Sequence, residues 1–207
     1  DFKKDRLFSV GDLIDRGPDN LDVFDWLCYD WFHAVRGNHD QMAIDAWNMR
    51  AITIQHIEDG ALWLTGLTEP EFAELAWSLD ALPHMIEVKT PQGLVGIVHA
   101  DVVGNDWNKT AAAIGKDTMQ AYHTEGHLMW NRDRFRGLHK GTVKGVDLMI
   151  VGHSTTNHVY MDNNVLFMDS GAVWKDVEPS KGFTKITDGF TLYDITNNKF
   201  YLEKEYQ

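Results

Sequence analysis

Two short stretches, Gly11-Asp12-Leu13-Ile14-Asp15-Arg16-Gly17 and Arg36-Gly37-Asn38-His39-Asp40, decide the fold. Each stretch follows a short apolar run, 6–10 and 32–36, and each comes before a stretch with apolar residues at helical spacing. The first fifty residues therefore follow the order strand, loop, helix, strand, loop, helix. This order is typical of βαβ units, and it predicts parallel strands in a layered α/β fold.

The rest of the chain predicts a second set of strands. A helix is expected over 71–79, a hairpin over 85–89 and 94–99, and a mixed, loop-rich region over 105–140. Short strands follow at 146–151, 158–161, 165–168, 190–194 and 199–203. With no repeat or linker in the sequence, we predict one domain over 1–207. Its class is α/β, a layered sandwich of two mixed β-sheets flanked by helices.

Composition limits the classes of function. The chain has 207 residues and a net charge of −12, which argues against a nucleic-acid partner because such partners need clustered Lys and Arg. It has no apolar run long enough for a membrane helix and no secretion signal at its start. The single cysteine, Cys28, suits a reducing compartment and is expected to be buried on a helix. We therefore expect a cytoplasmic protein with no membrane partner. The pattern indicates no particular oligomeric state.

Polar side chains follow four of the predicted strands: Asp12, Asn38 with His39, His99, and His153. Ligands bind at the carboxyl ends of strands in layered α/β folds. Asp, Asn and two His form a mixed oxygen and nitrogen set that suits Mn²⁺, Fe or Zn²⁺. Each place also has a structural explanation: a surface ion pair, a helix cap, or a histidine satisfied in the core.

The motifs GDLIDRG, RGNHD, VHAD and VGHS, in this order, resemble those of the metallophosphoesterase superfamily. More narrowly, they are similar to the serine/threonine protein phosphatases of the bacterial and phage-lambda type. The resemblance implies two divalent metal ions, with Mn²⁺ the first choice and Fe or Zn²⁺ the alternatives. It implies that Asp12 bridges the two ions. Asn38, His99 and His153 would then complete the second metal site.

The same resemblance implies roles for the remaining polar residues. His39 is the general acid for the leaving oxygen, and Asp15 orients it. Arg16 and Arg36 bind phosphate, and Arg132, within Trp130-Asn131-Arg132, is preferred over Arg134 as a third phosphate-binding arginine. The implied reaction is hydrolysis of a phosphoric monoester on a phosphorylated protein or peptide by a metal-activated water.

Two alternatives remain open. The first is a nucleotide phosphoesterase of the symmetrical diadenosine tetraphosphatase kind, whose members usually have Gly where this chain has Asp101. The second is a non-catalytic remnant that binds phosphate without turnover, although the intact pair His39 and Asp15 argues against it. An assay of phosphopeptide against dinucleotide separates the first alternative from a protein phosphatase.

Several other residues are given lesser roles. His123 and His127 have helical i, i+4 spacing but lack a carboxylate partner, and His158 is expected on a strand. Trp107 and Trp130 are candidates to line the substrate cleft. The remaining histidines are expected to be surface or structural residues: His33, His56, His84 and His139.

The resembled family carries a further motif, GDxHG, upstream of GDxxDRG, and its Asp and His hold the first metal. Asp12 has only eleven residues before it, and no other Asp-x-His occurs in the sequence. We therefore expect that the sequence lacks the N-terminal strand and this motif, so that the first metal site is incomplete. A protein of these residues alone is then expected to bind one ion tightly and to have little activity.

Overall fold

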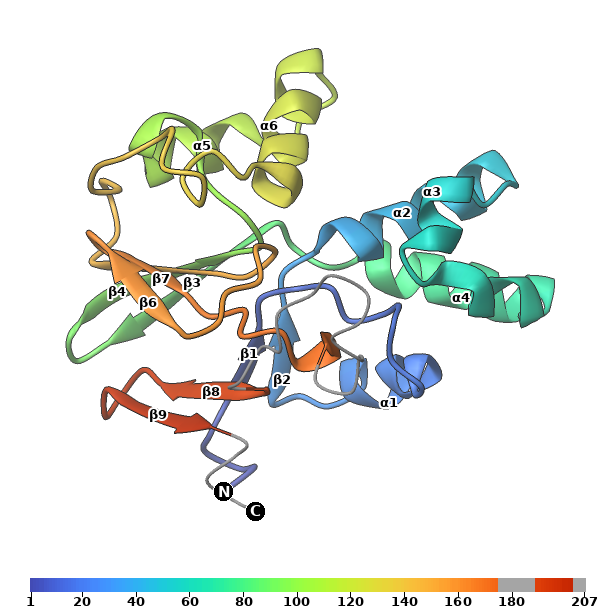
Figure 1. Ribbon diagram of the computed structural model, residues 1–207, viewed down its shortest axis with the longest axis horizontal. Coiled ribbons are helices and arrows are strands. Elements are labelled where there is room, and N and C mark those ends of the chain that lie inside the picture. The colour runs from blue at the N-terminus through green and yellow to red at the C-terminus, as the bar shows by residue number, and fades with distance from the viewer. Residues whose placement is uncertain (175–188, 203–207) are drawn as a thin grey trace.

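The computed structural model describes residues 1–174 and 189–202, in which helices cover a set of β-sheets (Figure 1). The α-helices are α1 (Val23–Leu27), α2 (Asn38–Met49), α3 (Ile54–Glu58), α4 (Glu69–Asp80), α5 (Trp107–Ala113) and α6 (Met119–Trp130). Short 3-10 turns complete the helical part: η1 (Asn20–Asp22), η2 (Ala61–Gly66), η3 (Val103–Asn105) and η4 (Ala172–Trp174).

The largest sheet is mixed and has the strand order β3-β4-β5-β7-β6. Its strands are β3 (Met85–Thr90), β4 (Gly93–Val98), β5 (Leu148–Val151), β6 (Tyr160–Asp162) and β7 (Val165–Phe167). The antiparallel pair β3 and β4 confirms the predicted hairpin. The central strands β4, β5 and β7 run parallel, so β4 and β5 end at the same edge of the sheet.

Two small sheets lie beside the large one. β1 (Leu7–Ser9) pairs in parallel with β2 (Phe32–Ala34), as the βαβ order predicts. β8 (Thr191–Asp194) and β9 (Lys199–Leu202) form an antiparallel hairpin. The second mixed sheet of the predicted sandwich is thus divided into two pairs. Among the described strands, β1 pairs with β2 alone.

Alternate residues of the central strands face two different apolar layers. Ile150 on β5 packs with Val35, next to β2, and with partly buried residues of β1, β8 and β9. Its neighbours Met149 and Val151 face the opposite side, where Trp107 and Leu128 lie in α5 and α6. The period of two along a strand therefore makes one sheet the middle of a layered structure. A third apolar cluster joins α2 and α4 to the β1–β2 side.

The helices α5 and α6 correct the loop-rich prediction for 105–140. Asp106 and Thr118 cap the two helices through their side chains, accepting hydrogen bonds from Lys109 and Ala121. The aromatic ring of Trp107 is fully buried, so it does not line a cleft as predicted. It lies over Gly96, where an added Cβ would be 2.6 Å from the ring.

Cys28 is exposed, which corrects the prediction that it is buried. The helix α1 has only five residues and ends at Leu27. Cys28 therefore lies past its last turn and not on its apolar face. Within the described residues, no helix is both long and apolar enough to cross a membrane.

Candidate active site

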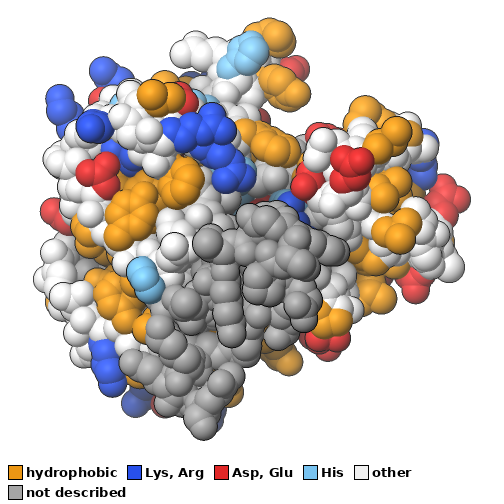
Figure 2. Space-filling model, in the orientation of Figure 1, with side chains coloured by type: hydrophobic (Ala, Val, Ile, Leu, Met, Phe, Trp, Pro, Cys, Tyr) orange, Lys and Arg blue, Asp and Glu red, His pale blue; other side chains and the backbone are white. Residues whose placement is uncertain are grey.

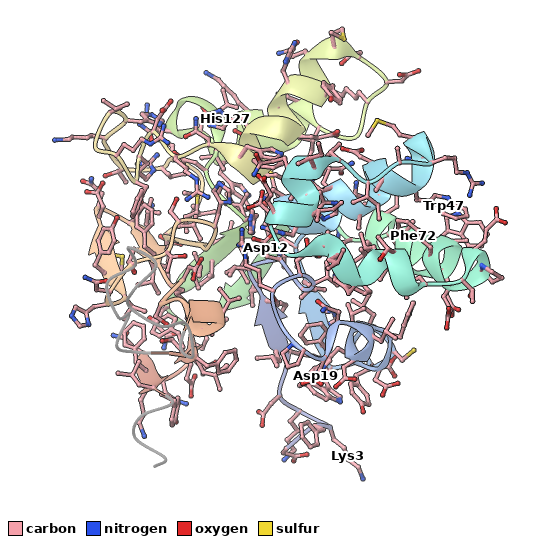
Figure 3. The ribbon with its side chains drawn as sticks, turned by 45° about the vertical axis from the view of Figure 1, so that its right-hand side comes forward. Lys3, Asp12, Asp19, Trp47, Phe72 and His127 are labelled. Atoms are coloured by element: carbon pink, nitrogen blue, oxygen red, sulfur yellow. The ribbon has the colours of Figure 1, made fainter. Side chains whose placement is uncertain are left out.

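Four side chains meet where β1, β2, β4 and β5 end: Asp12, Asn38, His99 and His153. The Asn38 Oδ1 atom lies 2.7 Å from His153 Nδ1 and 3.0 Å from His99 Nε2. The Oδ1 atom of Asp12 lies 3.4 Å from His99 Nε2. Figure 3 places Asp12 in the middle of the molecule, between the strands and the α2–α4 helices. The structure therefore brings together all four metal ligands predicted from the sequence.

The spacing of these atoms fits a divalent cation. Ligand atoms about 2.1 Å from a small cation lie about 3.0–3.4 Å from one another, close to the separations found here. The Nδ1–H of His99 donates to the Val10 carbonyl at 2.5 Å, so Nε2 is the ring nitrogen that faces Asn38 and that can bind a cation once it has lost its proton. The Asn38 Oδ1 atom and the lone pair of His99 Nε2 are both acceptors, so this contact needs a proton or a cation between the two atoms.

The electrostatics of the site keep Asp12 ionised and His153 neutral. Burial alone would raise the pKa of Asp12, but the charge and hydrogen bond of His99 lower it well below its usual value. Burial, followed by the positive charges of His99 and Arg132, lowers the pKa of His153 to about 3. A carboxylate and a neutral imidazole are the forms in which these side chains bind metals.

Asp40 connects the two motif loops, residues 11–17 and 36–40, through hydrogen bonds. Its buried carboxylate accepts hydrogen bonds from the backbone amides of Asp12 at 3.0 Å, Leu13 at 2.9 Å and Gly37 at 2.7 Å. In return, the Asp12 carboxylate accepts the amide of His39 at 3.0 Å. Asp12 thus belongs to the first loop and binds the backbone of the second, so the acidic residues of both motifs hold the loops together.

The backbone at the site adopts conformations that are rare outside glycine. Asp12, Asp15, Arg16 and His153 have φ values of 55°, 72°, 59° and 63°. Non-glycine residues in this left-handed region cost free energy and cluster at functional sites. The surrounding hydrogen bonds, such as the one from the Asp15 amide to Asn20 Oδ1 at 2.6 Å, hold the loop in this form.

A His–Asp pair lies next to the ligand cluster. The Nδ1–H of His39 donates to Asp15 Oδ2 at 2.7 Å, and both side chains are buried. Because Nδ1 is used by Asp15, Nε2 is the ring nitrogen that can exchange a proton with a substrate. The structure therefore joins the predicted general acid to its predicted orienting residue.

Two further residues, His56 and Trp63, complete the surroundings of Asp15. His56 Nε2 lies 2.9 Å from Asp15 Oδ2, and Trp63 Nε1 donates to Asp15 Oδ1 at 2.8 Å. Burial raises the pKa of Asp15, but the hydrogen bonds from His39, His56 and Trp63 outweigh it and lower the pKa. Sequence patterns predict only a surface or structural role for His56 and no role for Trp63, because these contacts join residues more than forty positions apart.

The predicted phosphate-binding arginines separate into two groups. Arg132 donates to Ser154 Oγ at 3.4 Å, next to His153, and lies within electrostatic range of Asp12 and Arg16. Arg16 pairs with Asp59 at 2.9 Å at the edge of the same site. Basic side chains gather on one side of the hollow between the α5–α6 part of the surface and the α2–α3 part (Figure 2).

The Arg36 side chain points toward α2 and the end of α4. Its guanidinium donates to Gln41 Oε1 at 2.9 Å and pairs with the Asp80 carboxylate at 2.9 Å, at the end of α4. We therefore expect Arg36 to support the fold and not to bind phosphate, in contrast to the prediction. Its position in the RGNHD motif is adjacent to the site in sequence, but its long side chain turns toward the helices.

Arg134 forms a buried ion pair with Asp101. Its Nε donates to both oxygens of Asp101, at 3.1 and 3.2 Å, and both side chains are buried. Asp101 therefore anchors the loop after α6 to the end of β4. Since its carboxylate is used in this way, Asp101 gives no support for choosing between protein and nucleotide substrates.

The remaining candidates from the sequence, Trp130 and three histidines, lie outside the two possible ion-binding groups. Trp130 is partly exposed, and its ring centre lies 6.2 Å from that of His153, so it remains a candidate for the cleft wall. Among the described residues, the His and acidic groups close enough to hold an ion are Asp12 with His99 and His153, and Asp15 with His39 and His56. Neither group includes His123, His127 or His158.

A layered α/β fold with a candidate cation site at its strand ends, and a His–Asp pair beside it, is the arrangement expected of a metallophosphoesterase. Solved structures agree with this fold. A protein assigned as a diadenosine tetraphosphatase aligns with a TM-score of 0.51 at 18% identity, covering 84% of this chain and 74% of that one. A cold-active protein tyrosine phosphatase mutant aligns with a TM-score of 0.52 at 14% identity, covering 95% and 66%.

Curated relatives narrow the class. The chain is 32% identical over 176 residues to serine/threonine-protein phosphatase 2 of Escherichia coli K12, covering 82% of this chain and 76% of that protein. It is 35% identical over 179 residues to serine/threonine-protein phosphatase 1 of Salmonella typhimurium, covering 84% and 76%. A symmetrical bis(5'-nucleosyl)-tetraphosphatase of Pseudomonas fluorescens is 31% identical over 149 residues, covering 64% and 50%. No protein-family model matches the chain.

This chain belongs to the family of bacterial serine/threonine protein phosphatases within the metallophosphoesterase superfamily.

Proposed function

We propose that this protein is a metal-dependent phosphomonoesterase that removes phosphate from serine or threonine residues of proteins. The observation that carries the proposal is the convergence of Asp12, Asn38, His99 and His153 beside the pair formed by His39 and Asp15. The relatives named as serine/threonine-protein phosphatases support the choice of substrate.

The four converging ligands would hold a divalent cation, for which Mn²⁺ is our first choice and Fe or Zn²⁺ are the alternatives. Such an ion supplies Lewis-acid activation of water and compensates the charge of the phosphoryl group. Within the described residues, the clustered ligands account for one ion. A second ion sharing Asp12 would need ligands in addition to these four.

The side chains around the cation site have complementary tasks. Arg132 and Arg16 bind the phosphoryl oxygens through charge-assisted hydrogen bonds and orient the ester. His39 donates a proton from Nε2 to the leaving oxygen of serine or threonine, which is a poor leaving group as an alkoxide. Asp15 accepts the Nδ1–H of His39 and stabilises the ring in its protonated form.

A nucleotide substrate is the second candidate, supported by the relative named as a tetraphosphatase. That relative matches a smaller share of this chain than the protein phosphatases do. A non-catalytic role is disfavoured because the hydrogen bond between His39 and Asp15 is intact at 2.7 Å.

The test is a direct comparison of substrates, made on the protein expressed from its complete gene with Mn²⁺ present. A phosphoserine peptide and diadenosine tetraphosphate are supplied at equal concentration, and the His39→Asn variant serves as the inactive control. We expect kcat/KM to be higher for the phosphopeptide and to fall about 10²–10⁴-fold in the variant. Faster turnover of the dinucleotide would show that the nucleotide reading is correct, and turnover of neither substrate would refute both enzymatic functions.

A further inference from the structure

The Asp15 carboxylate is held by more donors than orientation of His39 alone would need. His39 Nδ1 and His56 Nε2 both lie within hydrogen-bond distance of Oδ2, at 2.7 and 2.9 Å. Trp63 Nε1 donates to the other oxygen at 2.8 Å. The side chains of Asp15 and His56 are each only 1% exposed, so water cannot replace these contacts easily.

The geometry of these contacts determines how the carboxylate is oriented. An ionised carboxylate only accepts hydrogen bonds, so His56 and Trp63 both act as donors. The last torsion of an aspartate is soft, and a single bond to His39 would let the carboxylate rotate. Donors on both oxygens fix the plane of the carboxylate, and this plane sets the direction of the His39 ring.

The segment that supplies these donors is built onto the first motif loop. Thr53 caps α3 by accepting the amide of His56 at 3.2 Å, which places the His56 ring on the inner side of the helix. Gly60 has a φ of 112°, and a Cβ there would lie 2.7 Å from the Arg16 amide. Asp59 pairs with the Arg16 guanidinium at 2.9 Å. The segment therefore contacts both Asp15 and Arg16, although neither contact involves the cation ligands.

We propose that His56 and Trp63 are positioning residues: they hold Asp15 and, through it, keep the His39 ring oriented for proton transfer to the leaving oxygen. The inference rests on the proposed function of the same site. It assigns the α3–η2 segment a task in catalysis in addition to its packing.

Kinetics on two substrates test the proposal. Trp63→Phe keeps an aromatic ring and removes the N–H donor, and His56→Leu removes the other donor. Loss of a residue that orients a metal ligand typically costs about 10- to 100-fold in activity, and we expect the same range for a residue that orients a general acid. We expect a loss of this size in kcat for a phosphoserine peptide, with KM within about twofold of the parent. For p-nitrophenyl phosphate, whose leaving group needs no proton, the loss should be much smaller.

Matched variants separate positioning from general loss of structure. Trp77→Phe makes the same exchange on the exposed surface of α4, and it should leave both substrates unaffected. Leu64→Ala weakens the packing of the same η2 segment at a buried position and removes no donor from Asp15. His56→Gln restores an N–H donor and should recover much of the activity lost in His56→Leu. If Leu64→Ala reproduced the substrate-dependent loss, or if Gln gave no rescue, the positioning role would be wrong.

A double variant shows whether the residues act through His39. In the His39→Asn background, Trp63→Phe should cause no further loss of kcat, because the group that it positions has been removed. Full additivity of the two losses would overturn the proposal.

A readout that does not depend on turnover completes the test. The His39 Nδ1–H proton, shielded from water and bonded to Asp15, should give a downfield proton NMR signal that broadens in Trp63→Phe and persists in Trp77→Phe. An unchanged signal in Trp63→Phe, together with full activity, would overturn the positioning role alone. A parent protein that hydrolyses no phosphate ester would overturn the proposed function, and with it the catalytic part of this inference.

Discussion

Replacing Gly37 by alanine should separate the two motif loops. An added Cβ would lie 2.2 Å from Asp12 Oδ1 and 2.4 Å from the Asp12 amide nitrogen, and contacts under 3.0 Å are essentially never seen. The backbone of Gly37, with φ −94° and ψ 176°, is open to alanine, so the penalty is purely steric. Backbone and a cation ligand meet the new methyl group, and neither can rotate away.

The size of the effect follows from the distance that the loops must move. They need to separate by about 1 Å, and overpacking of this kind typically costs about 1–3 kcal/mol of stability. The amide of Gly37 also donates to Asp40 at 2.7 Å, so the movement strains the carboxylate that joins the two loops. Because Asp12 and Asn38 lie on opposite sides of the contact, we expect Mn²⁺ affinity to fall by about 10-fold or more.

Urea denaturation and calorimetric titration with Mn²⁺ measure the two effects. Gly126→Ala is the matched control: Gly126 lies within α6 with nothing within 4 Å of an added Cβ, so alanine should stabilise the protein by up to about 1 kcal/mol. A Gly37→Ala variant with the stability and Mn²⁺ affinity of the parent would show that the loops do not meet as described.

Four other substitutions test residues in and around the site. His39→Asn should reduce kcat on an alkyl phosphate by about 10²–10⁴-fold and on an aryl phosphate by less, with metal content unchanged; equal losses would contradict a general acid. Arg132→Ala should weaken competitive inhibition by inorganic phosphate, whereas Arg36→Ala should leave it unchanged and lower the melting temperature; the opposite pattern would reverse their roles. Arg134→Met should lower the free energy of unfolding by about 3–5 kcal/mol, because the buried Asp101 carboxylate loses its arginine and keeps only the Val102 amide and His139; a loss below about 1 kcal/mol in urea denaturation would argue against a buried pair.

The cation ligands could be predicted from the sequence because each one directly follows a strand. Local patterns locate strand ends, and parallel strands bring these ends together, so Asp12, His99 and His153 are close in space although distant in the chain. The direction of a long side chain is not determined by such patterns. Arg36 illustrates this, since its guanidinium reaches Asp80 at the end of α4.

Local sequence patterns do not predict contacts that form only when distant segments pack together. His56 lies in a one-turn helix with no motif, and its bond to Asp15 crosses 41 residues. The sequence does not predict α5 and α6, because Gly115 and Gly126 interrupt a weakly periodic region. Capping by Asp106 and Thr118 and packing on β4 and β5 stabilise the two helices. The sequence leaves Trp107 as a candidate for the cleft wall, yet its ring is buried over Gly96.

The central claim is that Asp12, Asn38, His99 and His153 hold a divalent cation. An anomalous difference map from a crystal of the protein soaked in Mn²⁺, recorded at the manganese edge, tests it most directly. We predict a peak about 2.2 Å from the Asp12 carboxylate, Asn38 Oδ1, His99 Nε2 and His153 Nδ1. A map with no peak among these four side chains, at a Mn²⁺ concentration that supports turnover, would contradict the claim.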